Sequence, residues 1–204
     1  MPDRSRQSPE QSEGESNSST QRAEWAARSH DARTLEKLRE DERYFLRQLV
    51  STPCLSAIAK AEGAYIEDVQ GRRYLDFHGN NVHHIGYGHP RLKRAIAEQM
   101  DELPFAPRRF ACDPATALAR KLVEIAPGEL SKVLFTTGGS DAVEVALKLA
   151  RAATGRHKTV SFWDAFHGAG FGAASVGGEQ LFRSYAAGPL LPGAEHVAPF
   201  ACYR

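Results

Sequence analysis

Thr136-Thr137-Gly138-Gly139-Ser140-Asp141 stands between a short apolar run, residues 133–135, and an amphipathic stretch, residues 142–151, that is typical of a helix. A Gly-Gly turn between a strand and a helix presents free backbone N–H groups at the positive end of the helix dipole, which attracts anions such as phosphate. Glycine permits the sharp turn and the close approach of a ligand to the backbone. The turn therefore indicates either a phosphate site or a ligand-free connection from strand to helix.

The residues in and around the turn argue against two common kinds of phosphate ligand, nucleoside triphosphates and dinucleotides. The turn does not carry the Lys-Ser/Thr pair of a nucleoside triphosphate loop or the third glycine of a dinucleotide fingerprint. A second glycine-rich stretch, residues 168–172, has a spacing that resembles a nucleotide loop, but neither a clear helix nor an acidic partner follows it. We regard this second stretch as a weak signal.

A strand, a helix and a second strand are expected around the turn. Residues 132–135 predict the first strand and residues 158–163 the second, so the segment predicts a βαβ unit and an α/β fold with a parallel sheet. Ligands collect at the carboxyl ends of such strands. Phe166 and His167 follow the second strand, and Phe166 either stacks on a flat ring at this rim or is an ordinary core residue.

The rest of the chain divides by composition. Residues 1–30 contain no Val, Ile, Leu or Phe, which predicts a disordered tail. Residues 31–103 predict a helix, then a hairpin whose arms, 64–69 and 72–77, are joined by a glycine turn, then a helix over 90–102. Residues 104–204 begin with a helix over 114–125, whose apolar side chains are expected to face inward, and become rich in Gly and Pro after residue 168.

Bulk properties exclude several classes of protein. The net charge of the 204 residues is +1, which favours neither nucleic acid nor an anionic membrane as a partner. No apolar run approaches the length of a membrane span. The cysteines are odd in number, widely spaced and without a CxxC pair, which fits a reducing compartment. We therefore expect a cytoplasmic protein.

Two groups of polar residues invite a ligand. Four histidines, His78, His83, His84 and His89, lie in one loop, but no cysteine or second cluster accompanies them, so no metal site is expected. Arg108 and Arg109 follow a proline-stiffened loop, where they either grip a dianion or remain solvated surface charges.

The order of these pieces resembles the class III aminotransferase family, enzymes of fold type I that use pyridoxal 5′-phosphate (PLP). The resemblance rests on residues 65–77, 86–90, 137–151 and 166–168. It implies an incomplete fold type I PLP-transferase: an N-terminal segment with a β-hairpin, then the first βαβ portion of the large-domain sheet. Residues 31–103 correspond to part of the small domain and 104–204 to the beginning of the PLP-binding large domain.

The resemblance assigns roles to residues of the turn. The backbone N–H groups of Gly139 and Ser140 hold the PLP phosphate, the Ser140 hydroxyl assists, and Asp141 stands where the family usually has Glu. Phe166 stacks on the pyridine ring and His167 lies beside it. A homodimer and a small-molecule amine substrate are also implied.

Further blocks, residues 77–84, 103–110 and 188–197, resemble a branch of the family that releases ammonia from an aminophosphonate. This branch gives Arg108 and Arg109 a role as ligands of a phosphonate dianion, and Asn81 is a further candidate for substrate binding. The alternative within the family is an ordinary ω-amino-group transferase.

The family chemistry also needs a Schiff-base lysine and a carboxylate at the pyridine nitrogen. In the family both lie later in the large domain, and no lysine follows Lys158 in this sequence. We therefore expect no catalytic residue in this chain and an N-terminal portion that is inactive alone. The non-enzymatic alternative is that the chain is a truncated remnant without catalytic activity.

Overall fold

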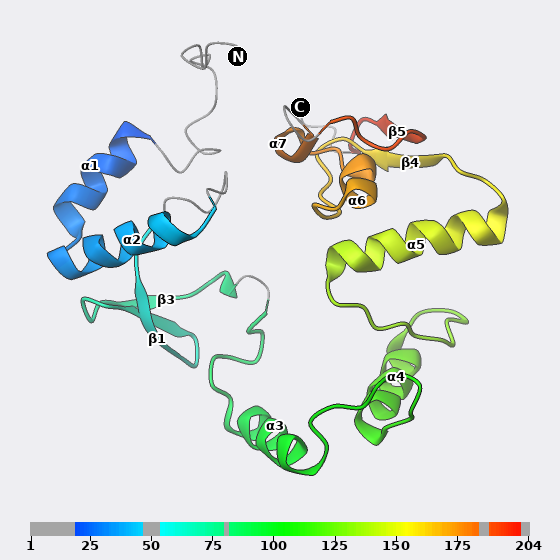
Figure 1. Ribbon diagram of the computed structural model, residues 1–204, viewed down its shortest axis with the longest axis horizontal. Coiled ribbons are helices and arrows are strands. Elements are labelled where there is room, and N and C mark those ends of the chain that lie inside the picture. Colours follow the sequence, from blue (N-terminus) through cyan, green and yellow to red (C-terminus); the bar gives the residue numbers. More distant parts are fainter. Residues whose placement is uncertain (1–18, 47–53, 80–81, 184–187, 201–204) are drawn as a thin grey trace. The chain divides into compact units, whose positions relative to one another are not determined.

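The computed structural model describes residues 19–46, 54–79, 82–183 and 188–200. The chain divides into two units, Met1–Ala106 and Pro107–Arg204, each with its own set of internal contacts (Figure 1). The division falls three residues after the boundary expected from composition.

Two helices open the first unit, α1 (Thr20–Ser29) and α2 (Ala32–Tyr44). Helix α1 lies within the segment that was expected to be disordered, so that expectation is wrong for residues 20–29. Ser19 caps its first turn by accepting the Arg22 N–H at 3.1 Å. Its last turn is held from far along the chain, because Arg72 Nη1 donates to the Ser29 carbonyl at 3.0 Å.

A three-stranded antiparallel sheet follows, made of β1 (Ile58–Glu62), β2 (Tyr65–Asp68) and β3 (Arg73–Leu75), in that order. The expected hairpin of β2 and β3 is confirmed, with Ile66 opposite Tyr74 and Gly71 in the turn at φ 81°. Strand β1 was not expected from the sequence.

Asp68 is the polar centre of this turn and is 1% exposed. Its carboxylate accepts the Arg72 Nε–H at 2.7 Å, the Tyr74 hydroxyl at 3.0 Å, and the backbone N–H groups of Gln70 and Arg72 at 2.9 Å each. Burial alone would raise the pKa of Asp68, but the hydrogen bonds from Arg72, Tyr74 and Gln70 outweigh it and lower this pKa from 3.8 to about 2.

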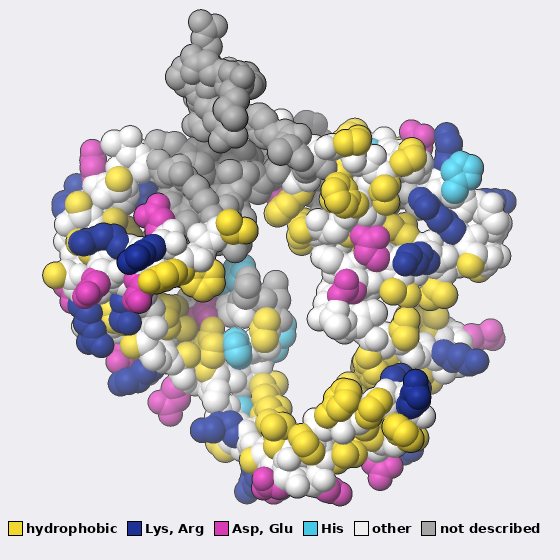
Figure 2. Space-filling model, in the orientation of Figure 1, with side chains coloured by type: hydrophobic (Ala, Val, Ile, Leu, Met, Phe, Trp, Pro, Cys, Tyr) yellow, Lys and Arg dark blue, Asp and Glu magenta, His cyan; other side chains and the backbone are white. Residues whose placement is uncertain are grey.

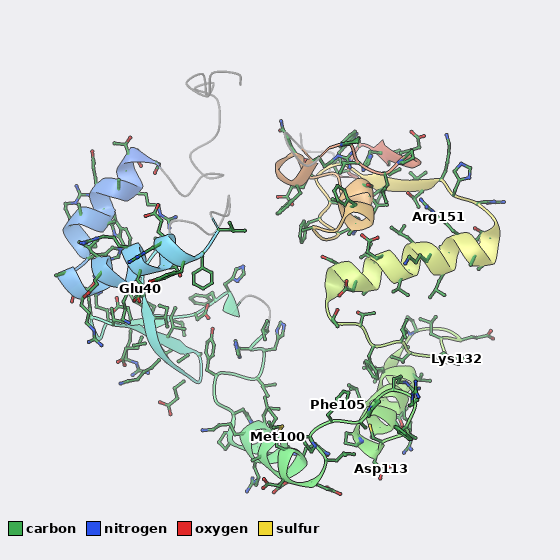
Figure 3. The ribbon with its side chains drawn as sticks, viewed as in Figure 1. Glu40, Met100, Phe105, Asp113, Lys132 and Arg151 are labelled. Carbon is green, nitrogen blue, oxygen red and sulfur yellow. The ribbon has the colours of Figure 1, made fainter. Side chains whose placement is uncertain are left out.

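Helix α3 (Pro90–Glu102) occupies the expected residues and begins with proline in its first turn. Leu92, Ile96 and Met100 form its apolar face, and each remains about half exposed. Met100 is labelled on this helix in Figure 3, and Figure 2 shows hydrophobic side chains on its surface. Helix α4 (Asp113–Ile125) in the second unit is similar, since Leu118 and Ile125 are exposed rather than inward as expected. Among the described elements of its own unit, neither helix packs extensively against another element.

The second unit continues with α5 (Gly139–Thr154), β4 (Thr159–Phe162), α6 (Phe171–Val176), α7 (Gln180–Arg183) and β5 (Ala194–Val197). Gly155 ends α5 in the left-handed conformation, at φ 68°. Strands β4 and β5 pair in parallel, with Thr159 opposite Ala194 and Phe162 opposite Val197. Helix α6 contacts α5 and both strands, and Ala173, Ala174 and Val176 form the core of the unit.

The α/β fold is thus confirmed, but the βαβ unit is not the expected one. Residues 132–135 do not form a strand, because a strand exists through hydrogen bonds to a neighbour and no described residue pairs with them. The parallel pair is β4–β5, joined through α6 and α7. The segment after Gly168, expected to be irregular, supplies α6, α7 and β5.

Candidate cofactor site

The N-terminus of α5 forms an open turn. Gly138 is its N-cap residue, and no side chain caps the helix there. A Cβ added at Gly138 or Gly139 would meet no atom within 4 Å, so the space above the turn is free. Because the first amides of a helix have no intrahelical acceptor, the N–H groups of Gly139 and Ser140 can receive an anion. Asp141 accepts the Thr137 hydroxyl within the same turn.

The segment after β4 lies directly against this turn. The Ala169 N–H donates to Ser140 Oγ at 3.2 Å. Gly168 is buried, and a Cβ there would lie 2.5 Å from Ser140 Oγ. The structure therefore brings the Gly139–Ser140 turn together with the chain that carries Phe166 and His167, two of the residues singled out in the sequence.

Phe166 presents an aromatic surface at this place. Its side chain is 55% exposed, and its ring centroid lies 4.6 Å from that of Phe182, with the planes tilted by 46°. His167 is oriented by a hydrogen bond between its Nε2 and Ser161 Oγ at 3.3 Å. A half-exposed ring backed by a second ring is suited to stack on a flat heterocycle.

Helix α7, which carries Phe182, is anchored by Arg183. Its Nη1 donates to the carbonyls of Ala174, Ser175 and Gly177 at 3.0, 2.9 and 2.6 Å. Its guanidinium also lies 5.5 Å from the centre of the Trp163 ring. Neither Phe182 nor Arg183 was identified from the sequence, because no local motif marks a contact that depends on the fold.

The residues proposed to bind substrate are less defined. Arg108 and Arg109 are exposed, and no contact joins them to the α5 turn among the described residues. Asn81 lies outside the described residues.

The histidine loop is built around Asp76. This carboxylate accepts the Tyr87 hydroxyl at 2.6 Å and the backbone N–H groups of His78 and Gly79 at 2.9 Å each. These hydrogen bonds, the Tyr87 hydroxyl first, lower the pKa of Asp76 from 3.8 to about 2. Asp76 and Tyr87 line a cavity of about 270 Å³ with His78, His83 and other loop residues. Across the described ranges, no group of three or more His, Cys, Asp or Glu is arranged to hold a metal ion.

The α5 turn therefore offers unpaired backbone N–H donors, and the segment in contact with it at Gly168 and Ala169 carries the exposed ring of Phe166 two residues earlier. A phosphorylated heterocycle fits this donor set, since one end needs N–H groups and the other a ring to stack on.

Comparison with known proteins agrees with this geometry. A family model described as aminotransferase class-III matches residues 48–202. The chain belongs to the class III aminotransferase family. The resemblance inferred from the sequence motifs is thereby confirmed.

Several members of the family are similar to this chain. The (R)-1-hydroxy-2-aminoethylphosphonate ammonia-lyase of Vibrio splendidus (strain 12B01) is 48% identical over 193 residues, which are 95% of this chain and 40% of the relative. An aminotransferase structure from Bacillus anthracis matches 86% of this chain and 41% of its own, at 34% identity and a TM-score of 0.74.

A taurine:2-oxoglutarate aminotransferase from Bifidobacterium kashiwanohense, solved with PLP and glutamate, matches 83% of this chain and 39% of its own, at 31% identity and a TM-score of 0.73. The present chain thus spans about 40% of the length of these relatives. None of the helices in the described ranges is both long and apolar enough to cross a membrane.

Proposed function

We propose that this chain supplies the phosphate- and ring-binding part of a PLP-dependent ammonia-lyase that converts (R)-1-hydroxy-2-aminoethylphosphonate into phosphonoacetaldehyde. The family membership supports PLP, and the 48% identity to the Vibrio enzyme supports the reaction. One structural observation supports the proposal: Ser140 contacts the Gly168–Ala169 backbone, in the segment that also carries Phe166 and His167.

Each residue of this site has a distinct role. The N–H groups of Gly139 and Ser140 bind the phosphate. The Ser140 hydroxyl accepts the Ala169 N–H and so keeps its own proton to donate to a phosphate oxygen. Phe166 stacks on the pyridine ring, and His167, held by Ser161, lies at its side. When bound, PLP supplies an electron sink for loss of a proton next to the amine nitrogen.

The substrate part of the proposal concerns a dianion. Arg108, Arg109 and Asn81 bind the phosphonate group, for which the planar, permanently charged guanidinium is well matched. The net reaction is redox-neutral: the hydroxyl group leaves as water, and one water molecule replaces the amino group, which leaves as ammonia and gives the aldehyde. The proposal includes a cytoplasmic homodimer, as the family resemblance implies.

A second function, transfer of an amino group to a keto acid, is favoured by the structural relatives, several of which are transaminases. The two functions separate in one experiment on the full-length protein. Incubation with PLP and the hydroxy-aminophosphonate, without a keto acid, should release ammonia and aldehyde in equal amounts. Turnover that requires a keto acid would favour the transaminase, and failure to bind PLP would exclude both.

A further inference from the structure

Glu144 joins α5 to the segment that carries the proposed ring-stacking residue. It lies four residues after Ser140, and its Oε1 accepts the Ala173 N–H at 2.8 Å, in the first turn of α6. Ala173 is fully buried and Glu144 is partly buried. A hydrogen bond from a buried N–H to a carboxylate is charge-assisted and therefore among the stronger kinds.

Two hydrogen bonds from backbone N–H groups join the segment after β4 to α5, and they are spaced four residues apart on both sides of the contact. Ser140 binds Ala169, and Glu144 binds Ala173. Residues four apart on a helix lie on the same face, so one face of α5 holds this segment at two points.

The alternating glycines of residues 168–172 follow from the same contact. A Cβ at Gly168 would lie 2.5 Å from Ser140 Oγ, one at Gly170 would lie 2.8 Å from Glu144 Oε1, and one at Gly172 would collide with the Glu144 carboxylate. The spacing that resembled a nucleotide loop is thus a surface on which α5 packs.

We propose that Glu144 is a positioning residue that sets the distance between the phosphate-binding turn and Phe166. The inference rests on the proposed PLP site and deepens it. The hydrogen bond that the structure gives to the Glu144 side chain comes from the Ala173 N–H. It fixes the first turn of α6, which follows Phe166 by a few residues, and the Ser140 contact fixes the other end of the same segment.

The affinity of a ligand that contacts both the phosphate-binding turn and Phe166 should depend on the distance between them. The affinity of a ligand that contacts only the turn should not. The test therefore compares PLP with inorganic phosphate in the full-length protein, using Glu144→Ala and Glu144→Asp. The aspartate carboxylate is one methylene shorter, so it keeps the charge but withdraws from Ala173. Glu124→Ala serves as the control, because Glu124 is exposed on α4 and pairs with Lys121 of the same helix at 3.0 Å.

Glu144→Ala should weaken PLP binding by roughly tenfold or more, the effect of losing one charge-assisted hydrogen bond. Binding of inorganic phosphate should change less than about twofold. Glu144→Asp should also weaken PLP binding more than phosphate binding, but by a smaller factor. If the alanine variant does not fold, the aspartate variant alone tests the inference. The visible circular dichroism of bound PLP should also change in both variants.

Two results would overturn the inference while leaving the PLP site intact: unchanged PLP affinity and dichroism in the variants, or an equal loss for PLP and phosphate. A wild-type protein that binds no PLP would instead refute the proposed function itself.

Discussion

Gly168 approaches Ser140 so closely that a Cβ on the glycine would lie 2.5 Å from the serine Oγ and 2.9 Å from its Cα. Gly168 also has a φ of 127°, which residues with a side chain rarely adopt. The position therefore requires glycine for two independent reasons. The contact brings together two segments that are far apart in the sequence.

Gly168→Ala should weaken PLP binding at least tenfold, or about 1.4 kcal/mol, because the added methyl group must push the segment away from the α5 turn. Fluorescence titration of the full-length protein with PLP measures this. Gly128→Ala is the control for a positive-φ glycine without a collision, since Gly128 has a φ of 64° and a Cβ there meets no atom within 4 Å. Backbone strain of roughly 1 kcal/mol is expected in this control without loss of PLP affinity. A loss of PLP affinity in Gly128→Ala as large as that in Gly168→Ala would contradict the role of the Gly168–Ser140 contact.

Phe166→Ala should weaken PLP binding by roughly tenfold through loss of ring stacking and should leave inorganic phosphate binding unchanged. Phe182→Ala should have a smaller effect in the same direction, because Phe182 backs Phe166 at 4.6 Å. Phe45→Ala, at an exposed aromatic residue at the end of α2, provides the comparison. If Phe166→Ala binds PLP like the wild type, the ring does not stack on the cofactor.

Replacing Arg108 and Arg109 together by alanine should raise the KM of the full-length protein for the aminophosphonate by tenfold or more, since charged hydrogen bonds to a dianion are lost. The affinity for PLP should remain the same. Arg120→Ala removes an exposed charge from α4 and should change neither quantity. Steady-state ammonia release gives the values, and an unchanged KM in the double variant would refute the substrate role.

Asp68→Asn should lower the free energy of unfolding by about 2 kcal/mol at neutral pH, because a buried carboxylate that accepts several hydrogen bonds is lost. The pKa of Asp68 is lowered in the folded chain to about 2, so its stabilisation is present above the ordinary value of 3.8 and is lost as the pH falls toward 2. Denaturation of wild type and variant between pH 2 and pH 7 should thus converge at the acid end. Asp101→Asn, at an exposed position on α3, is the control, and its free energy of unfolding should stay close to that of the wild type across this pH range. A difference between the wild type and Asp68→Asn that is as large at pH 2 as at pH 7 would contradict the role of the Asp68 carboxylate.

The secondary structure that could be predicted from the sequence is the part that nearby residues specify. Helix α3 has its own proline start and apolar period, and the β2–β3 hairpin has Gly71 in its turn. Helix α1 was missed because its last turn depends on Arg72, more than forty residues away. The strand expected over residues 132–135 was wrong because an apolar run forms a strand only when a neighbouring strand pairs with it, and no described residue does so.

The same division holds at the candidate site. Gly139, Ser140 and Phe166 stand in patterns that are visible along the chain, so they could be proposed from the sequence, and their role in binding PLP stays a prediction. Glu144, by contrast, looked like an ordinary polar residue of an amphipathic helix, and its bond to Ala173 spans 29 residues. Phe182 and Arg183 lie in a stretch with no periodic signal. Their importance comes only from what the fold places beside them.

The glycines of residues 168–172 also bear on how such sequences diverge. Two of them leave room for the Glu144 carboxylate, and one leaves room for Ser140. The three positions therefore differ in how strictly they require glycine. A Cβ at Gly168 would meet the Ser140 Cα, which belongs to the helix backbone, whereas a Cβ at Gly170 or Gly172 would first meet the end of the flexible Glu144 side chain. Among relatives, glycine should thus be kept most strictly at the position of Gly168, and alanine or serine should be tolerated more readily at the positions of Gly170 and Gly172.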